Sequence, residues 1–126
     1  MNKIFKANEI KQFQRDGAIF LKNKFDLKWI DKLQKGIERD IKNPSPRFKS
    51  HTVEKGVPAY LEDYWTWHLV PEFKEFVFKS PYAQIASELM VAKNVNLVMD
   101  KWFLSEAGSK SSTPFHHDIS YFDMDG

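Results

Sequence analysis

Apolar side chains recur at helical spacing through most of the first ninety residues. In residues 27–42 they alternate with Lys, Glu and Asp, so that one face of the segment is apolar and the other is charged. A helix is therefore predicted over Leu27–Lys42, with Asp26 as its N-cap and the Pro-rich segment 43–46 as its end. The apolar positions are Ile30, Leu33, Ile37 and Ile41.

The same spacing predicts further helices on either side. One covers residues 9–15, with Asn8 as its cap and Gly17 as a left-handed terminal residue. A second covers residues 71–79. A third starts at Ser80-Pro81, because serine caps a helix and proline fits its first position.

β-Branched and aromatic residues dominate three other segments. Residues 18–22, 95–104 and 113–122 are predicted to be strands on this composition. The aromatic-rich segment 60–69 is ambiguous and is interpreted as a short helix. Residues 47–58 are interpreted as an irregular loop.

The character of the chain changes near residue 94. Residues 1–93 are expected to be mainly helical with one early strand, and residues 94–126 to form strands. A length of 126 residues suits one domain. Because an isolated pair of strands is marginally stable in water, the second part is interpreted as the beginning of a larger β-architecture. The fold class expected is α+β tending to β, as a single incomplete domain.

Composition narrows the class of protein. There are 19 Lys and Arg residues against 17 Asp and Glu, and this balance argues against a dedicated nucleic-acid or membrane-surface binder. The absence of cysteine excludes disulfide scaffolds, Cys-ligated zinc, iron–sulfur clusters and cysteine nucleophiles. No segment has the apolar character of a signal peptide or a transmembrane helix. A cytoplasmic protein that binds a small molecule, without nucleic-acid or membrane partners, is expected.

The clearest chemical motif is Phe115-His116-His117-Asp118. On a strand, residues i and i+2 point to the same face, so His116 and Asp118 project together and His117 faces away. An imidazole and a carboxylate side by side supply two of the three ligands in the facial triad of non-haem iron oxygenases. The motif is weak alone, and a zinc site or a His–Asp proton relay would use the same two side chains.

Longer blocks of sequence surround this motif. T-P-F-H-H-D-I-S-Y-F occupies residues 113–122, S-P-Y-A-Q-I-A-S-E-L-M residues 80–90, V-N-L-V-M-D residues 95–100 and R-D-G-A-I-F-L residues 15–21. In these blocks and their order the chain resembles the N-terminal portion of the phytanoyl-CoA dioxygenase family. Members of that family are Fe(II)- and 2-oxoglutarate-dependent oxygenases. The first block departs from the family pattern by having Phe at two positions where Trp is usual.

The resemblance implies a double-stranded β-helix, a jelly-roll-like barrel of the cupin type, preceded by helices. It also implies hydroxylation of a C–H bond in a small organic or lipid-like substrate, with 2-oxoglutarate converted to succinate and carbon dioxide. The resemblance assigns six residues: His116 and Asp118 to iron, Trp102 and His117 to the cosubstrate, and Phe115 and Tyr121 to the substrate pocket.

Two parts of the family's site have no counterpart in this sequence: a downstream His as third ligand, and the Arg that binds the far carboxylate of 2-oxoglutarate. The alternative to an enzyme is therefore an inactive, truncated fold that binds a partner or self-associates through unpaired strand edges. A zinc hydrolase using His116, Asp118 and His68 is a further hypothesis. The simpler interpretation is that His51 is exposed to solvent and His68 packs among aromatic rings.

Overall fold

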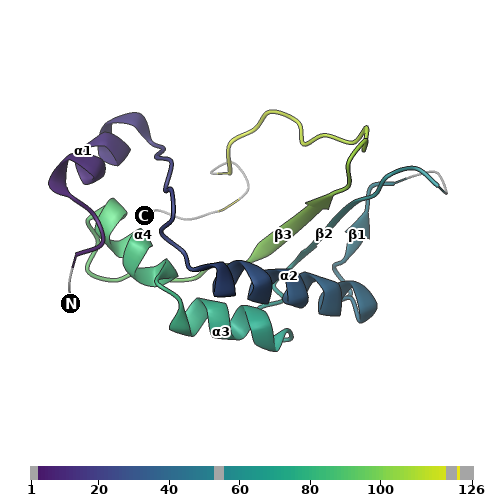
Figure 1. The fold of residues 1–126 in the computed structure, drawn as a ribbon. Coiled ribbons are helices and arrows are strands. Elements are labelled where there is room, and N and C mark those ends of the chain that lie inside the picture. The colour runs from purple at the N-terminus through teal and green to yellow at the C-terminus, as the bar shows by residue number, and fades with distance from the viewer. Residues whose placement is uncertain (1–2, 53–55, 119–121, 123–126) are drawn as a thin grey trace.

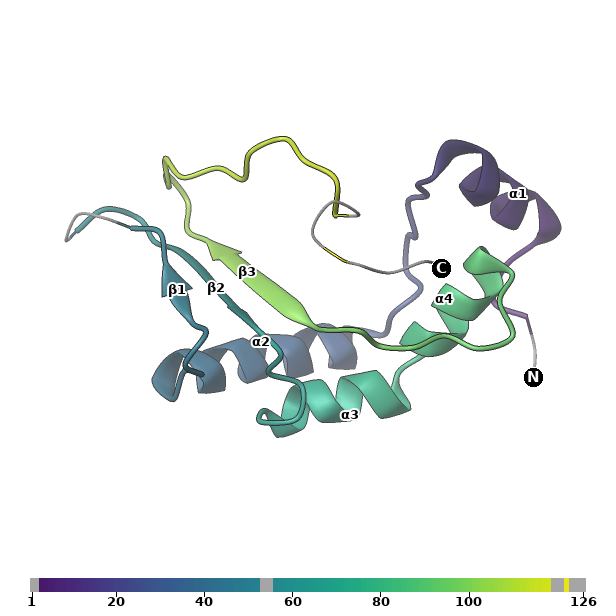
Figure 2. The ribbon, with the colours of Figure 1, turned by 180° about the vertical axis from the view of Figure 1, so that it is seen from behind.

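The computed structural model describes residues 3–52, 56–118 and 122 as four helices and a three-stranded antiparallel sheet. Helices α2 and α3 lie along one face of the sheet, and α1 and α4 pack together away from the strands (Figures 1 and 2). Among the described residues, no helix combines the length and apolar character needed to cross a bilayer. The elements are α1 (Ala7–Asp16), α2 (Leu27–Lys42), β1 (Lys49–Ser50), β2 (Tyr60–Tyr64), α3 (Pro71–Lys79), α4 (Tyr82–Met90) and β3 (Lys101–Ser105).

The four helices predicted from apolar spacing and capping are present, and two of them have the predicted bounds. Helices α2 and α3 begin and end at the predicted residues. Gly17 ends α1 in the left-handed conformation with φ of 71°. The predicted cap Asn8 is wrong, because α1 begins two residues earlier than predicted, at Ala7, with Lys6 at the N-cap. The Glu9 carboxylate accepts a 2.8 Å hydrogen bond from the Lys6 backbone N–H, and this contact fixes the earlier start.

The strand predicted over residues 18–22 is wrong, since this segment has no regular structure. Only Ile19 and Leu21 of its apolar side chains are partly buried, whereas Phe20 is 86% exposed. Ile19 and Leu21 pack against Phe5, Ile85 and Leu89, which form a buried cluster between the N-terminal segment and α4. These two side chains are thus buried without strand pairing. A short apolar run in the sequence does not show whether another strand is available to pair with it.

The short helix predicted over residues 60–69 is also wrong. Residues 60–64 form β2, the central strand, which pairs with β1 on one side and β3 on the other. This strand is hard to recognise in the sequence because it contains two adjacent charged residues, Glu62 and Asp63, which interrupt the usual alternation of apolar and polar residues. Both are buried with polar partners. The sheet therefore takes two of its strands from the part predicted to be mainly helical.

The C-terminal strands differ from prediction as well. Strand β3 covers residues 101–105, whereas residues 95–100 are extended without strand pairing. Residues 113–118 form no strand, and residues 119–121 of that prediction lie outside the described residues. After β3 the chain arches over the sheet face that α2 and α3 leave open (Figures 1 and 2).

The register of β2 and β3 determines which residues face the helices. Leu61 lies opposite Leu104 and Asp63 opposite Trp102, whereas Glu62 lies opposite Phe103. Because directly paired residues share a face, the first two pairs form one surface and the third belongs to the other. Trp102 is 8% exposed and packs with Val70, Phe73 and apolar residues of α2. This packed surface is the main core.

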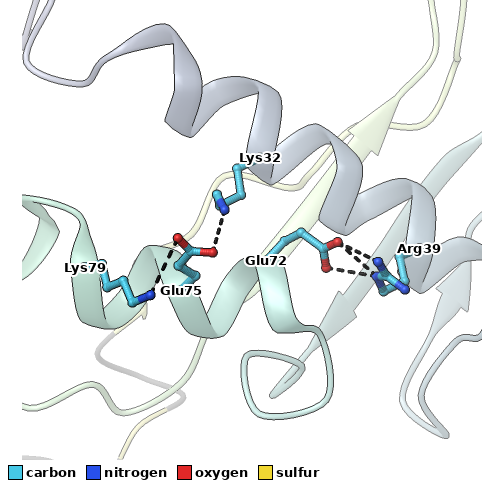
Figure 3. Close-up of polar contacts among 5 residues, drawn as sticks. All are labelled: Lys32, Arg39, Glu72, Glu75 and Lys79. Carbon is cyan, nitrogen blue, oxygen red and sulfur yellow. Dashed lines mark hydrogen bonds and ion pairs between the residues drawn. The ribbon is translucent and has the colours of Figure 1, made fainter.

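Ion pairs on the outside of the α2–α3 contact add to this core. Arg39 of α2 donates to both carboxylate oxygens of Glu72, at 2.8–3.1 Å. Figure 3 shows this fork beside a second group in which Glu75 lies between Lys32 and Lys79. Exposed pairs of this kind stabilise little. The Arg39–Glu72 and Lys32–Glu75 pairs join α2 to α3, whereas the Glu75–Lys79 pair lies within α3.

Candidate functional site

The open face of the sheet carries a cleft of about 360 Å³ beneath the C-terminal segment. The Tyr60 hydroxyl and Thr113 Oγ1 are 2.6 Å apart, and Ser111 Oγ donates to the His51 carbonyl at 3.4 Å. These bonds connect the segment to the first residue of β2 and to the residue that follows β1. The cleft is lined by His51, Tyr60, Glu62, Lys101, Phe103, Ser111, Ser112, Thr113, Pro114 and His116.

A buried carboxylate lies at the floor of the cleft. Glu62 is 6% exposed, and its two oxygens lie 2.9 Å from Lys101 Nζ and 3.5 Å from His51 Nε2. Burial by itself would raise the pKa of the Glu62 carboxyl. The hydrogen bond and charge of Lys101, with a smaller contribution from His51, outweigh burial and hold that pKa below its ordinary value. Glu62 is therefore a fixed negative charge that orients two basic groups.

The predicted ligands His116 and Asp118 are brought together at the rim of the cleft. His116 Nε2 lies 3.3 Å from Asp118 Oδ1, and His116 Nδ1 lies 2.7 Å from the Pro114 carbonyl oxygen. A carbonyl can only accept, so Nδ1 carries the proton and a neutral ring has its lone pair at Nε2. Two donor atoms bound to one ion at about 2.1 Å and at right angles would be roughly 3 Å apart. The pair thus fits two adjacent coordination positions.

The other predicted site residues are not brought to this pair. Trp102 faces the helices, and its indole N–H donates to Asp40 Oδ2 at 2.9 Å. The prediction that Trp102 shares a face with Leu104 is confirmed, but that face is the packed one. The Phe115 ring is fully exposed, His117 is exposed, and neither lines the cleft. Tyr121 lies outside the described residues.

The described residues contain no group of three or more His, Asp or Glu side chains arranged to hold a metal ion. The zinc site built on His116, Asp118 and His68 is therefore wrong, since all three residues are described. His68 is exposed with its ring against Trp67. Asp118 is 80% exposed and therefore open to a ligand arriving from solvent.

Sequence reasoning missed the polar floor of the cleft. Lys101 and Glu62 lie on the neighbouring strands β3 and β2, and their side chains are on the same face of the sheet. This proximity follows only from the register of the two strands. His51 was interpreted as a solvent-exposed residue. Its side chain is indeed 43% exposed, but it also contacts Glu62 and lines the cleft. Recognition of residues 60–64 as a strand would have placed Glu62 and Tyr60 on one face.

The fold and the site together define an α+β protein with a His-x-Asp pair beside a polar cleft on the open face of its sheet. Residues 13–126 match the family model described as Phytanoyl-CoA dioxygenase (PhyH), and the chain belongs to this family. The predicted resemblance is thereby confirmed. Comparisons with curated proteins and with solved structures gave no match.

Proposed function

We propose that the protein is an Fe(II)- and 2-oxoglutarate-dependent dioxygenase that hydroxylates a small organic or lipid-like substrate. Membership of the PhyH family supports oxygenase chemistry in general. The observation that carries the proposal is the 3.3 Å contact of His116 Nε2 with Asp118 Oδ1, at the rim of a cleft. The sheet, covered by helices on one face and open on the other, is compatible with the opening strands of a double-stranded β-helix.

In this proposal His116 and Asp118 hold iron. Iron held there would, with 2-oxoglutarate and O2 as co-reactants, supply the oxidation of a C–H bond to an alcohol; one oxygen atom of O2 would enter the alcohol and the other the succinate that forms as carbon dioxide is released. The protein's own residues prepare the ligands. The Pro114 carbonyl fixes the His116 tautomer that presents Nε2, as outer hydrogen bonds of metal-binding histidines commonly do. The cleft beside the pair provides the space for organic molecules.

Anaerobic calorimetric titration with Fe(II) tests this assignment. Wild-type protein is expected to bind the ion, and Asp118→Ala to abolish measurable binding, because it removes the charged ligand. Asp26→Ala is a matched control, since the Asp26 side chain is 73% exposed and that of Asp118 is 80% exposed. Wild type and Asp26→Ala should convert 2-oxoglutarate to succinate, and Asp118→Ala should not. Equal Fe(II) affinity in wild type and Asp118→Ala would overturn the assignment.

The second candidate function is self-association without catalysis. Strand β3 pairs with β2 along one edge, and no described strand pairs with its other edge. Such an edge presents unpaired N–H and C=O groups to another chain. Sedimentation velocity over a range of concentrations distinguishes the two candidates. A concentration-dependent dimer that neither binds Fe(II) nor consumes 2-oxoglutarate supports this candidate, and a monomer at all concentrations eliminates it.

A further inference from the structure

We infer that a pocket between the sheet and helices α2 and α3 binds an uncharged aromatic small molecule. The pocket has a volume of about 450 Å³. It lies on the helix side of the sheet, with Trp102 in its wall, whereas the cleft beside His116 and Asp118 lies on the open side (Figure 1). The sheet separates a molecule bound in this pocket from the His-x-Asp pair, so the inference goes beyond the proposed function and does not rest on it.

Three elements form the walls of the pocket: α2, α3 and the extended segment that precedes β3. Each of them turns apolar side chains toward the pocket that remain only partly buried. These side chains are Leu33, Ile37, Phe76, Val77, Leu97 and Met99. Protein interiors are close-packed and leave few voids larger than a water molecule. A space of this size beside the core is therefore one in which a further apolar group would be buried.

The volume of the pocket sets the size of its ligand. An apolar cavity of roughly 150 Å³ is large enough to bind benzene. The pocket is about three times as large, and it falls within the usual range for small-molecule sites, roughly 300–1,000 Å³. A compound of two fused rings fits this space with room for a small substituent.

The rings in the wall favour an aromatic ligand. Aromatic side chains line the pocket at Phe73, Phe76, Tyr82 and Trp102. The Phe76 and Tyr82 rings are 5.7 Å apart, and Phe76 also contacts the rings of Phe25 and Trp29 at 5.7 Å and 5.9 Å. These contacts hold the Phe76 ring in place before a ligand arrives, so little freedom is lost on binding. A further ring can join the group in an offset or edge-to-face arrangement.

The charged groups of the lining favour an uncharged ligand, because both of them are bound elsewhere. The Asp100 carboxylate accepts hydrogen bonds from the Thr66 backbone N–H at 3.0 Å and from the Thr66 hydroxyl at 2.9 Å. The Lys101 ammonium lies 2.9 Å from Glu62 on the open face. A charged ligand would lose its hydration in the pocket without gaining an oppositely charged partner, and this loss is costly.

The test is a titration of the full chain, followed by NMR of the methyl groups that line the pocket. The three probes share one carbon skeleton. 2-Naphthol is neutral and aromatic, decahydro-2-naphthol is neutral without being aromatic, and 2-naphthalenesulfonate is aromatic and charged. We expect 2-naphthol to bind most tightly and to shift the methyl signals of Ile37, Val77 and Leu97. The methyl groups of Ile85 and Leu89, in the separate cluster beside α1, are the internal control.

Variants that fill the pocket locate the binding. Leu97→Trp should weaken 2-naphthol binding by at least about tenfold, because the larger side chain occupies the space of the ligand. Val98→Trp is the matched control, since Val98 is the next residue of the same segment, is 52% exposed and is not among the lining residues. Val77→Phe fills the pocket from α3 and provides a second variant if Leu97→Trp does not fold.

The inference is overturned if 2-naphthol shifts no lining methyl signal, if either other probe binds as tightly, or if a folded filling variant binds 2-naphthol within twofold of wild type. It is also overturned if the lining signals move with protein concentration alone and sedimentation shows a dimer, because a second copy of the chain then occupies the pocket. None of these measurements involves iron or succinate formation, so the proposed function stands or falls separately.

Discussion

The two faces of the sheet use buried carboxylates in different ways. On the helix side, Asp40 and Asp63 are 2% and 0% exposed, and both are bound by groups that are themselves buried, Trp102 for Asp40 and Ser45 for Asp63. On the open side, Glu62 is 6% exposed, but its partners Lys101 and His51 border a cleft.

This difference distinguishes buried carboxylates that only support packing from one whose partners are open to solvent. The carboxylates on the packed face bind donors that no ligand can reach, so they specify how α2, the Ser45 segment and the strands fit together. Glu62 instead orients groups that a ligand can contact. Neighbouring residues of one strand serve both purposes, and the position of α2 and α3 alone decides which face becomes core.

The largest test of the comparison uses two adjacent aromatic residues of β3. Trp102→Ala should lower the free energy of unfolding by about 3–5 kcal/mol, because it empties a core position and leaves Asp40 without its donor. Phe103 is 48% exposed, so Phe103→Ala should lower the free energy of unfolding by less than about 1 kcal/mol. Urea denaturation measures both. Similar losses for the two variants would mean that both faces are packed.

The second test concerns the pH dependence of the packed face. Burial raises the pKa of Asp40 to about 6, against the hydrogen bond from Trp102 and with a further upward contribution from the Asp63 charge. A raised carboxyl pKa favours the folded state below the unfolded value near 3.8, and this contribution is lost as the pH rises to about 6.

Asp40→Asn cannot ionise, so its stability relative to wild type should increase with pH. Between about pH 4.5 and pH 7.5 the gain should be on the order of 2 kcal/mol. Denaturation curves at the two pH values measure it. Asp31→Asn, an exposed site of the same helix, controls for the change in net charge. A difference that does not change with pH would show that Asp40 is ionised equally in both states.

How much of the fold the sequence predicts depends on what each element contacts. Helices α2 and α3 were predicted to the residue because their own apolar stripes specify them. Strand β2 was not, because Glu62 and Asp63 are stable there only through Lys101 and Ser45, which come from distant parts of the chain. Local patterning cannot show such partners.

The site divides in the same way. The His116–Asp118 pair follows from neighbouring residues in one motif, and the two side chains meet even though the predicted strand is absent over residues 113–118. The position of Trp102 was predicted from alternation alone. Alternation shows which residues of a strand share a face, but not which of the two faces is buried. Lys101 and Glu62 required the register between β2 and β3.

A third effect is expected at the contact between α2 and α3. Alanine is normally about 1 kcal/mol better than glycine inside a helix. At Gly36, however, an added Cβ would lie 2.8 Å from Cδ1 of Phe73 and closer still to Cε1 of that ring. Because Phe73 is fixed in the core, Gly36→Ala should lower the free energy of unfolding by about 1–3 kcal/mol.

The cause can be separated from a general effect on α2. Gln34→Ala, at an exposed position of the same helix, should change stability by less than about 0.5 kcal/mol. In the double variant Gly36→Ala/Phe73→Leu, the smaller side chain makes room for the methyl group, so the alanine should cost less than it does beside Phe73. A stabilising effect of Gly36→Ala alone would show that the helices can move apart. The packing between α2 and α3 would then be more adaptable than the buried carboxylates of the packed face suggest.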